Sequence, residues 1–250
     1  MKDIALKVSI CMATYNGEKY VAEQINSVLD QLSSDDELVI VDDCSTDNTF
    51  QIILNFNDPR IKVYKNENNR SHVFTFSRVI SLAKNEIIFM ADQDDFWLKG
   101  RISLMKAKLM DSGKLLLSSN SEFIDSEGER INFHLDGVSS NQSFSHFKNI
   151  IDIFKGKTNY VGCAMAFKKE LNNVILPIPS FVESHDLWIA IAGNLLRSNL
   201  HMNEATLKRR IHSNNASIVS RKILLKLWSR FIFFISLLVL IKRIFLKKKI

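Results

Sequence analysis

The chain has 250 residues, of which 46% are apolar and 24% charged, a composition typical of a folded globular protein. Eight glycines and three prolines exclude long disordered stretches. The net charge of +6 is uneven: residues 221–250 hold nine of the 33 basic residues and no acid, which leaves 24 basic against 27 acidic residues in 1–220, a net charge of −3. This distribution argues against nucleic acid as a partner and favours an anionic membrane surface.

The cysteines and the first residues indicate a cytoplasmic location. Cys11, Cys44 and Cys163 are widely spaced, odd in number and form no C-x-x-C pair, a pattern typical of reduced thiols. The segment 1–6 has no extended apolar core, so we expect no signal peptide.

Residues 7–119 alternate between short apolar runs and stretches of helical periodicity. Apolar residues spaced by three or four predict helices, and short apolar runs predict strands. The expected strands cover 7–13, 37–41, 61–64, 86–91 and 115–119, and the expected helices cover 18–32, 47–56, 71–83 and 99–110. This repeated alternation is typical of an α/β fold with a mostly parallel sheet and helices on both faces.

The second half of the sequence is less regular. We expect a polar, weakly patterned region over 122–141, a helix over 144–154, a buried strand over 160–167 and an apolar helix over 187–196. The globular domain is expected to end near Ser220, which gives a domain of residues 1–220 and a tail of residues 221–250.

The strongest chemical signal is Asp92-Gln93-Asp94-Asp95 at the end of the apolar run 86–91. Open α/β sheets bind ligands at the carboxyl ends of their strands. Carboxylate oxygens there suit Mg²⁺ or Mn²⁺, which can neutralise a diphosphate. A solvated acidic turn is the alternative. The following Phe96-Trp97 argues against it, because these side chains are poor choices for a freely exposed loop.

A second acidic pair, Asp42-Asp43, follows the run 37–41. If the strands are parallel, both acidic clusters line one crevice. One of these two carboxylates can accept a hydrogen bond from a nucleotide base, although a helix-capping turn explains the pair equally well. Neither G-x-G-x-x-G after the first strand nor G-x-x-x-x-G-K-[ST] occurs, so dinucleotide-binding and P-loop interpretations lose their main support.

Four motifs, in this order, resemble those of the family 2 glycosyltransferases of the GT-A type. Residues 14–17 (TYNG) are similar to the family's T-Y-N-x, and residues 41–49 (VDDCSTDNT) to its V-D-D-x-S-x-D-x-T. Residues 92–95 resemble its D-x-D. Residues 210–215 (RIHSNN) are similar to the R-x-H-x-x-N of members that build bacterial surface polysaccharides. The resemblance covers residues 7 to about 217.

The resemblance implies inverting transfer of a sugar from a nucleoside diphosphate-sugar, UDP- or dTDP-linked, to an acceptor hydroxyl. It implies that Thr14, Tyr15 and Asn16 belong to the nucleotide site, with Thr14 and Tyr15 flanking the base. Asp43 is implied to bind the N–H edge of the base, and Arg210 the phosphates.

The same resemblance places Mn²⁺ or Mg²⁺ at the acidic motif. Asp94 is the implied direct ligand, Asp92 serves the ribose, metal and diphosphate, and His212 reaches the metal or diphosphate from the C-terminal side. A structural histidine is the alternative for His212. A metal and a cationic side chain stabilise the negative charge that develops as the nucleoside diphosphate leaves.

Inversion requires a base that deprotonates the incoming hydroxyl on the face opposite the leaving group. The resemblance assigns this role to Asp186, which matches the family's late acid before a helix. His185 precedes it, in departure from the usual Glu-Asp pair, so Glu183 is the second candidate; helix capping is the structural alternative for both acids. The Q-x-x-R-W motif of processive members is absent, which favours addition of a single sugar.

The tail contains the uncharged run 231–241 (FIFFISLLVLI). A spanning helix needs about 20 apolar residues, and Lys226, Arg230, Lys242 and Arg243 interrupt any longer run. We therefore expect an amphipathic helix in the membrane interface, with a short span and a dimer or partner interface as alternatives.

These features together predict a glycosyltransferase of bacterial surface polysaccharide synthesis, peripheral or monotopic at the cytoplasmic face of the inner membrane, with a lipid-linked glycan as acceptor. One alternative, a nucleotidyltransferase on a related sheet, needs a Gly-rich basic loop after the first strand, where only Gly17 is found. The other alternative is a non-catalytic membrane-associated protein that binds nucleotide-sugars. It is disfavoured because the acids of the implied site, Asp43, Asp92, Asp94 and Asp186, are all present.

Overall fold

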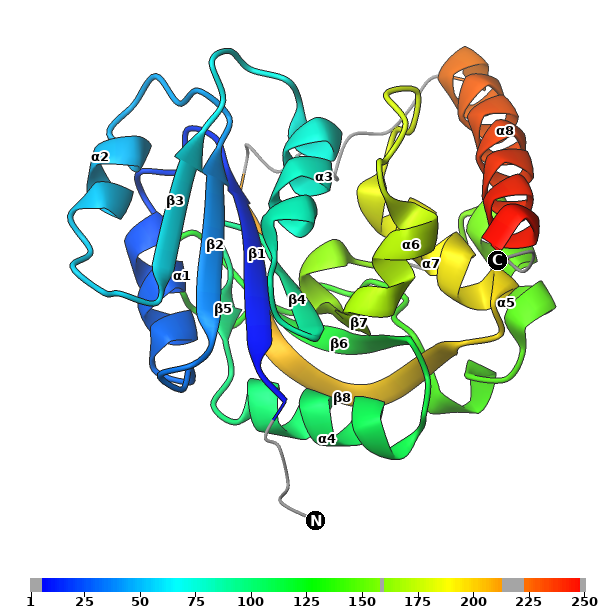
Figure 1. Cartoon of the computed structure of the whole chain (residues 1–250), viewed down its shortest axis with the longest axis horizontal. Coiled ribbons are helices and arrows are strands. Elements are labelled where there is room, and N and C mark those ends of the chain that lie inside the picture. Colours follow the sequence, from blue (N-terminus) through cyan, green and yellow to red (C-terminus); the bar gives the residue numbers. More distant parts are fainter. Residues whose placement is uncertain (1–5, 158–159, 213–222, 248–250) are drawn as a thin grey trace.

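The computed structural model of the protein describes residues 6–157, 160–212 and 223–247. Within these residues, one sheet of eight strands has helices on both faces, and the strand order is β3-β2-β1-β4-β7-β6-β8-β5 (Figure 1). The strands are β1 (Val8–Thr14), β2 (Glu37–Asp42), β3 (Ile61–Lys65), β4 (Ile87–Ala91), β5 (Phe96–Trp97), β6 (Leu116–Ile124), β7 (Met165–Lys168) and β8 (Asn199–Arg210). The predicted α/β class is confirmed.

The N-terminal half of the sheet is parallel. β1 lies between β2 and β4, and β3 pairs with β2 at the outer edge. Every residue of β2 and β4 is buried because both faces of these strands are covered, which is why their apolar runs predict them. Thr14 is in register with Asp42, and Met12 with Ala91, so these strands end at one edge of the sheet.

The C-terminal half of the sheet is mixed. β7 is antiparallel to β4 and β6, and β5 is antiparallel to β8, whereas β6 and β8 are parallel. The sequence pattern predicts neither β5 nor β8. β5 has two residues, and β8 mixes buried with exposed positions instead of forming an apolar run.

Two predicted boundaries in this half differ from the structure. The strand expected over 160–167 is reduced to β7, because the 3₁₀ turn η2 (Gly162–Ala164) precedes it. The chain passes close to the next helix there: a Cβ atom added to Gly162 would lie 2.7 Å from Nε2 of His185. β6 is longer than expected and extends to Ile124, into the region expected to be irregular.

Helices cover both faces of the sheet. One apolar core packs under α1 and α4, and a second packs under α3, α6, α7 and the C-terminal helix. The helices are α1 (Val21–Leu29), α2 (Thr49–Leu54), α3 (His72–Leu82), α4 (Arg101–Asp111), α5 (His146–Lys155), α6 (Asn172–Ile175), α7 (His185–Leu195) and α8 (Ile223–Lys247), with short 3₁₀ turns η1 (Ser140–Gln142) and η3 (Lys169–Leu171).

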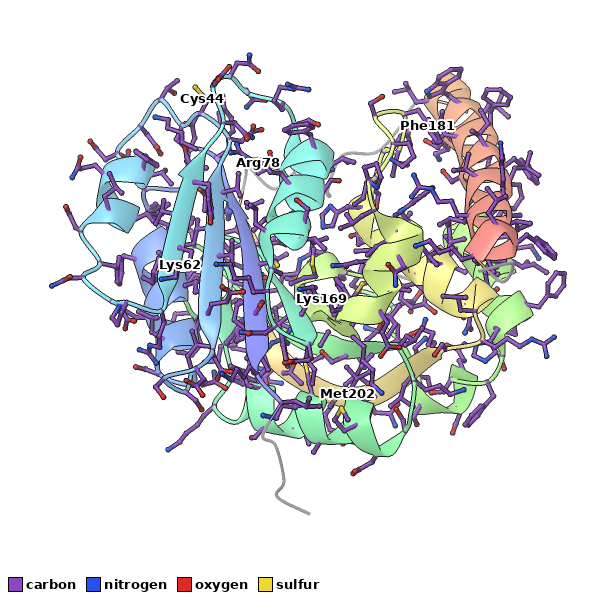
Figure 2. All side chains as sticks on the ribbon, viewed as in Figure 1. Cys44, Lys62, Arg78, Lys169, Phe181 and Met202 are labelled. Carbon is purple, nitrogen blue, oxygen red and sulfur yellow. The ribbon has the colours of Figure 1, made fainter. Side chains whose placement is uncertain are left out.

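The tail forms the helix α8, which packs on the domain beside α6 and α7 (Figure 1). Leu240 is fully buried and Ile232 nearly so, and both side chains belong to the inward side of the helix. Other side chains of α8 project away from the domain (Figure 2). No helix among the described residues is long and apolar enough to cross a membrane. The boundary expected near Ser220 falls on residues 213–222, outside the described part of the chain.

Candidate active site

The candidate site begins where β1 and β2 end side by side. Oγ1 of Thr14 donates to Oδ2 of Asp42 at 3.1 Å, and the backbone N–H of Asp43 donates to the carbonyl of Thr14 at 2.8 Å. Asp42 also accepts hydrogen bonds from the backbone and the hydroxyl of Ser45. Thr14 and Asp42 therefore stabilise the turn. Of the pair Asp42-Asp43, Asp42 has the structural role in a turn that was the alternative to base binding.

Asp43 is buried at the base of the same turn. Its Oδ1 atom accepts from Nδ2 of Asn66 at 2.6 Å and from the backbone N–H of Arg70 at 2.9 Å. Both contacts use one carboxylate oxygen. These two hydrogen bonds fix the orientation of the carboxylate.

Asn16 links the first two loops of the site. It adopts φ = 47°, a left-handed conformation that asparagine tolerates better than most residues. Its Oδ1 atom accepts from the backbone of Thr46 at 2.9 Å, and its N–H donates to Ser45 at 3.0 Å. The structure therefore gives Asn16 a role in holding the loop.

Gln93, to which the sequence assigns no role, joins the first loop to the acidic loop. Its Oε1 atom accepts from the backbone N–H of Tyr15 at 2.8 Å, and its Nε2 atom donates to the carbonyl of Tyr15 at 3.0 Å. A Cβ atom at Gly17 would lie 2.4 Å from the Gln93 side chain, so this contact requires glycine. The Tyr15 side chain remains 44% exposed and accessible to a ligand.

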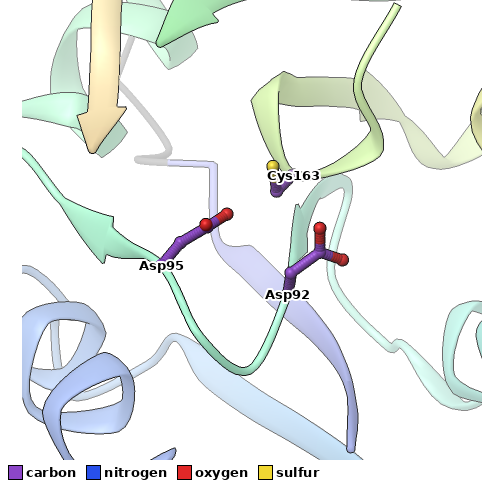
Figure 3. Close-up of side chains that lie close together, drawn as sticks. All are labelled: Asp92, Asp95 and Cys163. Carbon is purple, nitrogen blue, oxygen red and sulfur yellow. The ribbon is translucent and has the colours of Figure 1, made fainter. Parts of the chain in front are cut away.

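Three acidic or thiol groups crowd together beyond β4. Ligand atoms of Asp92, Asp95 and Cys163 lie within 4.8 Å of one another (Figure 3). The pKa of Asp92 is raised to about 8, mainly by burial and to a smaller extent by the carboxylates of Asp95 and Asp94. The pKa of Asp95 is raised to about 6, mainly by burial and then by the carboxylate of Asp94. Burial also raises the pKa of Cys163, so its thiol is protonated and a poor metal ligand.

Asp94 pairs with His212, as the family motifs imply. Oδ2 of Asp94 lies 2.9 Å from Nε2 of His212, and both side chains are largely buried. Carboxylates suit Mg²⁺ and Mn²⁺, and an imidazole nitrogen favours the transition metal. In the described part of the chain, however, the one group of three such donors within 4.8 Å of one another is Asp92, Asp95 and Cys163, so the structure does not bring Asp92 into one donor group with Asp94 and His212.

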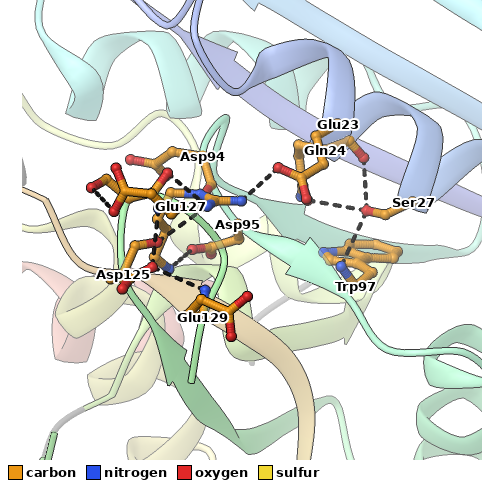
Figure 4. A network of polar contacts seen from close by, with 11 residues as sticks. Glu23, Gln24, Ser27, Asp94, Asp95, Trp97, Asp125, Glu127 and Glu129 are labelled. Atoms are coloured by element: carbon orange, nitrogen blue, oxygen red, sulfur yellow. Dashed lines mark hydrogen bonds and ion pairs between the residues drawn. The ribbon is translucent and has the colours of Figure 1, made fainter. Parts of the chain in front are cut away.

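Arg210 lies beneath the acidic loop and is bound entirely by protein groups. Its guanidinium donates to the carbonyls of Asp94 and Asp125 at 3.1 Å each and to Oε2 of Glu23 at 2.5 Å. This network ties the acidic loop to α1 and to the turn after β6 (Figure 4). The structure therefore places Arg210 as a support for the loop, where the sequence predicts a phosphate ligand.

Arg209, the neighbouring residue of β8, faces the acids. Burial alone would lower its pKa, but the neighbouring acidic groups, among them Asp95, Asp92 and Asp186, raise it. Successive residues of a strand point to opposite sides. Two adjacent arginines therefore have different surroundings, and Arg209 is a cation whose charge acts on Asp92, Asp95 and Asp186.

Asp186 lies in the first turn of α7, close to this group. Its charge acts on both Asp92 and Arg209. Its Oδ1 atom accepts from the hydroxyl of Ser184 and, at 3.0 Å, from the backbone of Leu187, so the first turn of the helix fixes the carboxylate. Ser184 is the N-cap of α7.

Glu183 is directed to a different part of the molecule. Its Oε2 atom accepts from the hydroxyl of Ser229 in α8 at 2.7 Å. The two candidate bases are therefore distinguished by their partners: Asp186 interacts with the acid and arginine group, and Glu183 with the C-terminal helix.

A cavity of about 570 Å³ lies beside the turn that Arg210 holds. It is lined by the end of β6 and the segment after that turn: Ser121, Glu122, Phe123, Arg130, Ile131, Asn132, Phe133, His134 and Leu135. A second cavity of about 200 Å³ shares Ser121, Phe123 and Leu135 with it and extends to Val161. The rings of Phe123 and Phe133 meet edge to face beside this cavity, with centroids 5.0 Å apart.

Comparisons with known proteins show the family of the chain. The sequence pattern described as Glycosyl transferase family 2 matches residues 9–176, more than half of the chain. The putative teichuronic acid biosynthesis glycosyltransferase TuaG of Bacillus subtilis (strain 168) is 24% identical over 225 residues, 88% of this chain and 85% of TuaG. The Escherichia coli protein WfgD, a UDP-Glc:alpha-D-GlcNAc-diphosphoundecaprenol beta-1,3-glucosyltransferase, is 31% identical over 118 residues, 47% of each chain.

The crystal structure of Staphylococcus aureus TarS 1–349 in complex with UDP has a similar fold. It superposes with a TM-score of 0.66 at 21% identity, over 82% of this chain and 61% of that chain. The present chain thus spans about half the length of WfgD and less than two thirds of that TarS fragment. The fold is therefore the GT-A-like α/β fold. With the match over residues 9–176, the chain belongs to glycosyl transferase family 2.

Proposed function

We propose that the protein transfers one sugar, with inversion, from a UDP- or dTDP-sugar to a hydroxyl of a lipid-linked glycan in bacterial surface polysaccharide synthesis. The observation that carries the proposal is that the Asp94–His212 pair, the Arg209 cation and the Asp186 carboxylate gather around one buried acidic group. Membership of family 2 supports a transferase over the nucleotidyltransferase alternative.

The donor nucleotide is proposed to lie on the loops after β1 and β2. The exposed Tyr15 ring would stack on the base, and Asp43, held by Asn66 and Arg70, would accept from the base N–H. Thr14 and Asn16 contribute by fixing these loops.

Asp94 and His212, with Asp92, would hold Mn²⁺ or Mg²⁺, which supplies positive charge against the leaving diphosphate. Arg209 would contact the phosphates directly, and Arg210 would position Asp94 through its backbone carbonyl. We therefore propose Arg209 in the role that the family motif assigns to Arg210.

Asp186 would take the proton of the acceptor hydroxyl. Its Oδ1 atom is occupied by Ser184 and Leu187, which orients the carboxylate as a general base must be oriented. Glu183 is engaged by α8, so we propose a positioning role for it.

The acceptor and location are proposed from the relatives and the charge distribution. WfgD takes an acceptor on diphosphoundecaprenol, a lipid carrier, as its name states. The basic C-terminal segment 221–250 carries no acid. Both support a peripheral enzyme on the anionic cytoplasmic face of a bacterial inner membrane.

A thermal-shift screen of UDP, dTDP and other nucleoside diphosphates, each with and without Mn²⁺, tests the donor part of this proposal. A ligand that binds only the folded state raises the melting temperature. We expect stabilisation by UDP or dTDP that depends on the metal. An unchanged melting temperature with every nucleotide would overturn the transferase proposal.

A further inference from the structure

The outward side of α8 is apolar although it is exposed. Seven of its side chains recur every few residues around one side of the helix and are between 52% and 66% exposed: Leu227, Trp228, Phe231, Phe234, Leu238, Phe245 and Leu246. At 1.5 Å per residue, the stripe extends about 28 Å along the helix. Exposed apolar surfaces of this extent mark sites of interaction.

A separate segment of the chain continues this surface. Phe154 of α5 packs against Phe233 and Phe234 of α8, with ring centroids 5.4 and 5.2 Å apart. Phe147 lies two helical turns before Phe154, on the same side of α5, and is 76% exposed. We call the seven side chains of α8 together with Phe147 the aromatic face.

The charge on α8 identifies the occupant of the aromatic face. The helix has five basic residues and no acid, and Lys226, Lys242 and Lys247 are exposed. Aromatic side chains mixed with lysines are typical of surfaces that lie in the headgroup layer of a membrane. We propose that the aromatic face is seated in an anionic lipid bilayer, an inference that rests on the lipid-linked acceptor of the proposed function.

The orientation of this face relative to the active site is fixed by contacts on the inward side of α8. Arg243 donates to the carbonyls of Val174 at 2.9 Å and Pro177 at 2.7 Å, and Ser229 donates to Glu183 at 2.7 Å. These contacts hold both ends of the segment that leads to Asp186. A bilayer on the aromatic face would therefore lie beside the segment that presents the base, where a lipid-linked acceptor arrives.

Co-sedimentation of the full-length chain with vesicles tests the proposal, and no sugar donor is needed. Vesicles of phosphatidylglycerol with phosphatidylcholine are compared with phosphatidylcholine alone. We expect binding to the anionic vesicles that added salt weakens. Phe231→Asp with Leu238→Asp should lower the apparent affinity about tenfold or more, and Phe147→Asp alone by about threefold, because each removes buried apolar area and adds a repelled charge.

The matched control is Leu54→Asp on α2, at the opposite end of the molecule from α8 (Figure 1). Leu54 is also 50% exposed, and its variant should bind vesicles like the unmodified chain. Point variants are preferable to deletion of α8, because deletion would uncover the core around the buried Leu240.

Three results would overturn the proposal: unchanged vesicle binding by the Phe231/Leu238 variant, equal binding to both kinds of vesicle, or a stable dimer in vesicle-free solution that this variant dissociates. The last would make the aromatic face a contact between copies of the chain. None of these results depends on nucleotide binding, so failure here is distinguishable from failure of the donor assay.

Discussion

The two sides of the active site are held in place by different means. On the proposed nucleotide side, loops after β1, β2 and β4 are joined to one another by hydrogen bonds of Asn16, Asp42 and Gln93. On the proposed acceptor side, Asp186 lies in the first turn of α7, and the segment that leads into this helix is held by the remote helix α8. The first side is therefore self-supporting, and the second depends on an element that sequence alone suggests is a separate tail.

The largest effect is expected at the nucleotide side. Asp94→Ala should lower turnover by at least about a hundredfold, because it removes a proposed ligand of the metal ion whose positive charge would stabilise the leaving diphosphate. Steady-state kinetics with a UDP- or dTDP-sugar would measure this loss. The melting temperature should change little, since the side chain of Asp94 bonds mainly to His212. Turnover like that of the unmodified enzyme would contradict the metal assignment.

The acceptor side is probed by its two acids. Asp186→Asn should lower turnover on the order of a hundredfold or more, because general base catalysis is lost. Glu183→Gln is the matched variant: it retains a hydrogen-bond acceptor for Ser229 and should keep most of the activity. Equal losses in kcat would show that Glu183 takes part in proton transfer.

The two adjacent arginines separate catalysis from stability. Arg209→Ala should lower turnover, whereas Arg210→Ala should lower the free energy of unfolding by about 3 kcal/mol, since it leaves Glu23 and two part-buried carbonyls without their partner. Urea denaturation measures the second effect. The reverse pattern would restore Arg210 as the phosphate ligand.

The last effect concerns the dependence of stability on pH. Burial holds the pKa of His185 and of His201 at about 4, well below their value of about 6.5 in the unfolded chain. The unfolded chain therefore binds protons first, and the stability contributed by the two neutral histidines is lost as the pH falls from about 6.5 to 4, by up to about 3 kcal/mol each.

Denaturation in urea across this pH range measures that loss. His185→Phe should flatten the curve of unfolding free energy against pH, because it removes the group that takes up a proton. The ring of Phe should fit the site, since His185 stacks on Phe76 with ring centroids 3.9 Å apart and neither of its ring nitrogens has a hydrogen-bond partner in the described residues. An equally steep curve in this variant would show that His185 does not contribute.

The sequence predicts the nucleotide side well. Strands buried on both faces must be nearly all apolar, so β1, β2 and β4 are visible as runs, and the polar residues at their ends are brought together by parallel pairing. The Asp94–His212 pair follows from family motifs that lie far apart in the sequence.

The acceptor side resists prediction because its geometry depends on distant pairing. Which of Arg209 and Arg210 faces the acids depends on the register of β8 against β6, and β8 has no continuous apolar run. Cys163 reaches the acids through a 3₁₀ turn in a stretch that reads as a strand. The apolar pattern of α8 predicts a helix. No pattern in the sequence around it indicates its inward contacts with Val174, Pro177 and Glu183.

Gln93 has a consequence for changing donor preference. Its amide bonds both backbone groups of Tyr15, so the loop that would meet the base and the loop that bears Asp94 form a single unit. Redesign of base recognition at Tyr15 that shifts this backbone would also displace the acidic loop. Variant libraries directed at a new nucleotide should therefore keep Gly17 and Gln93 constant and vary the residues around Asp43. The Asp43 carboxylate is held separately, by a hydrogen bond from Asn66.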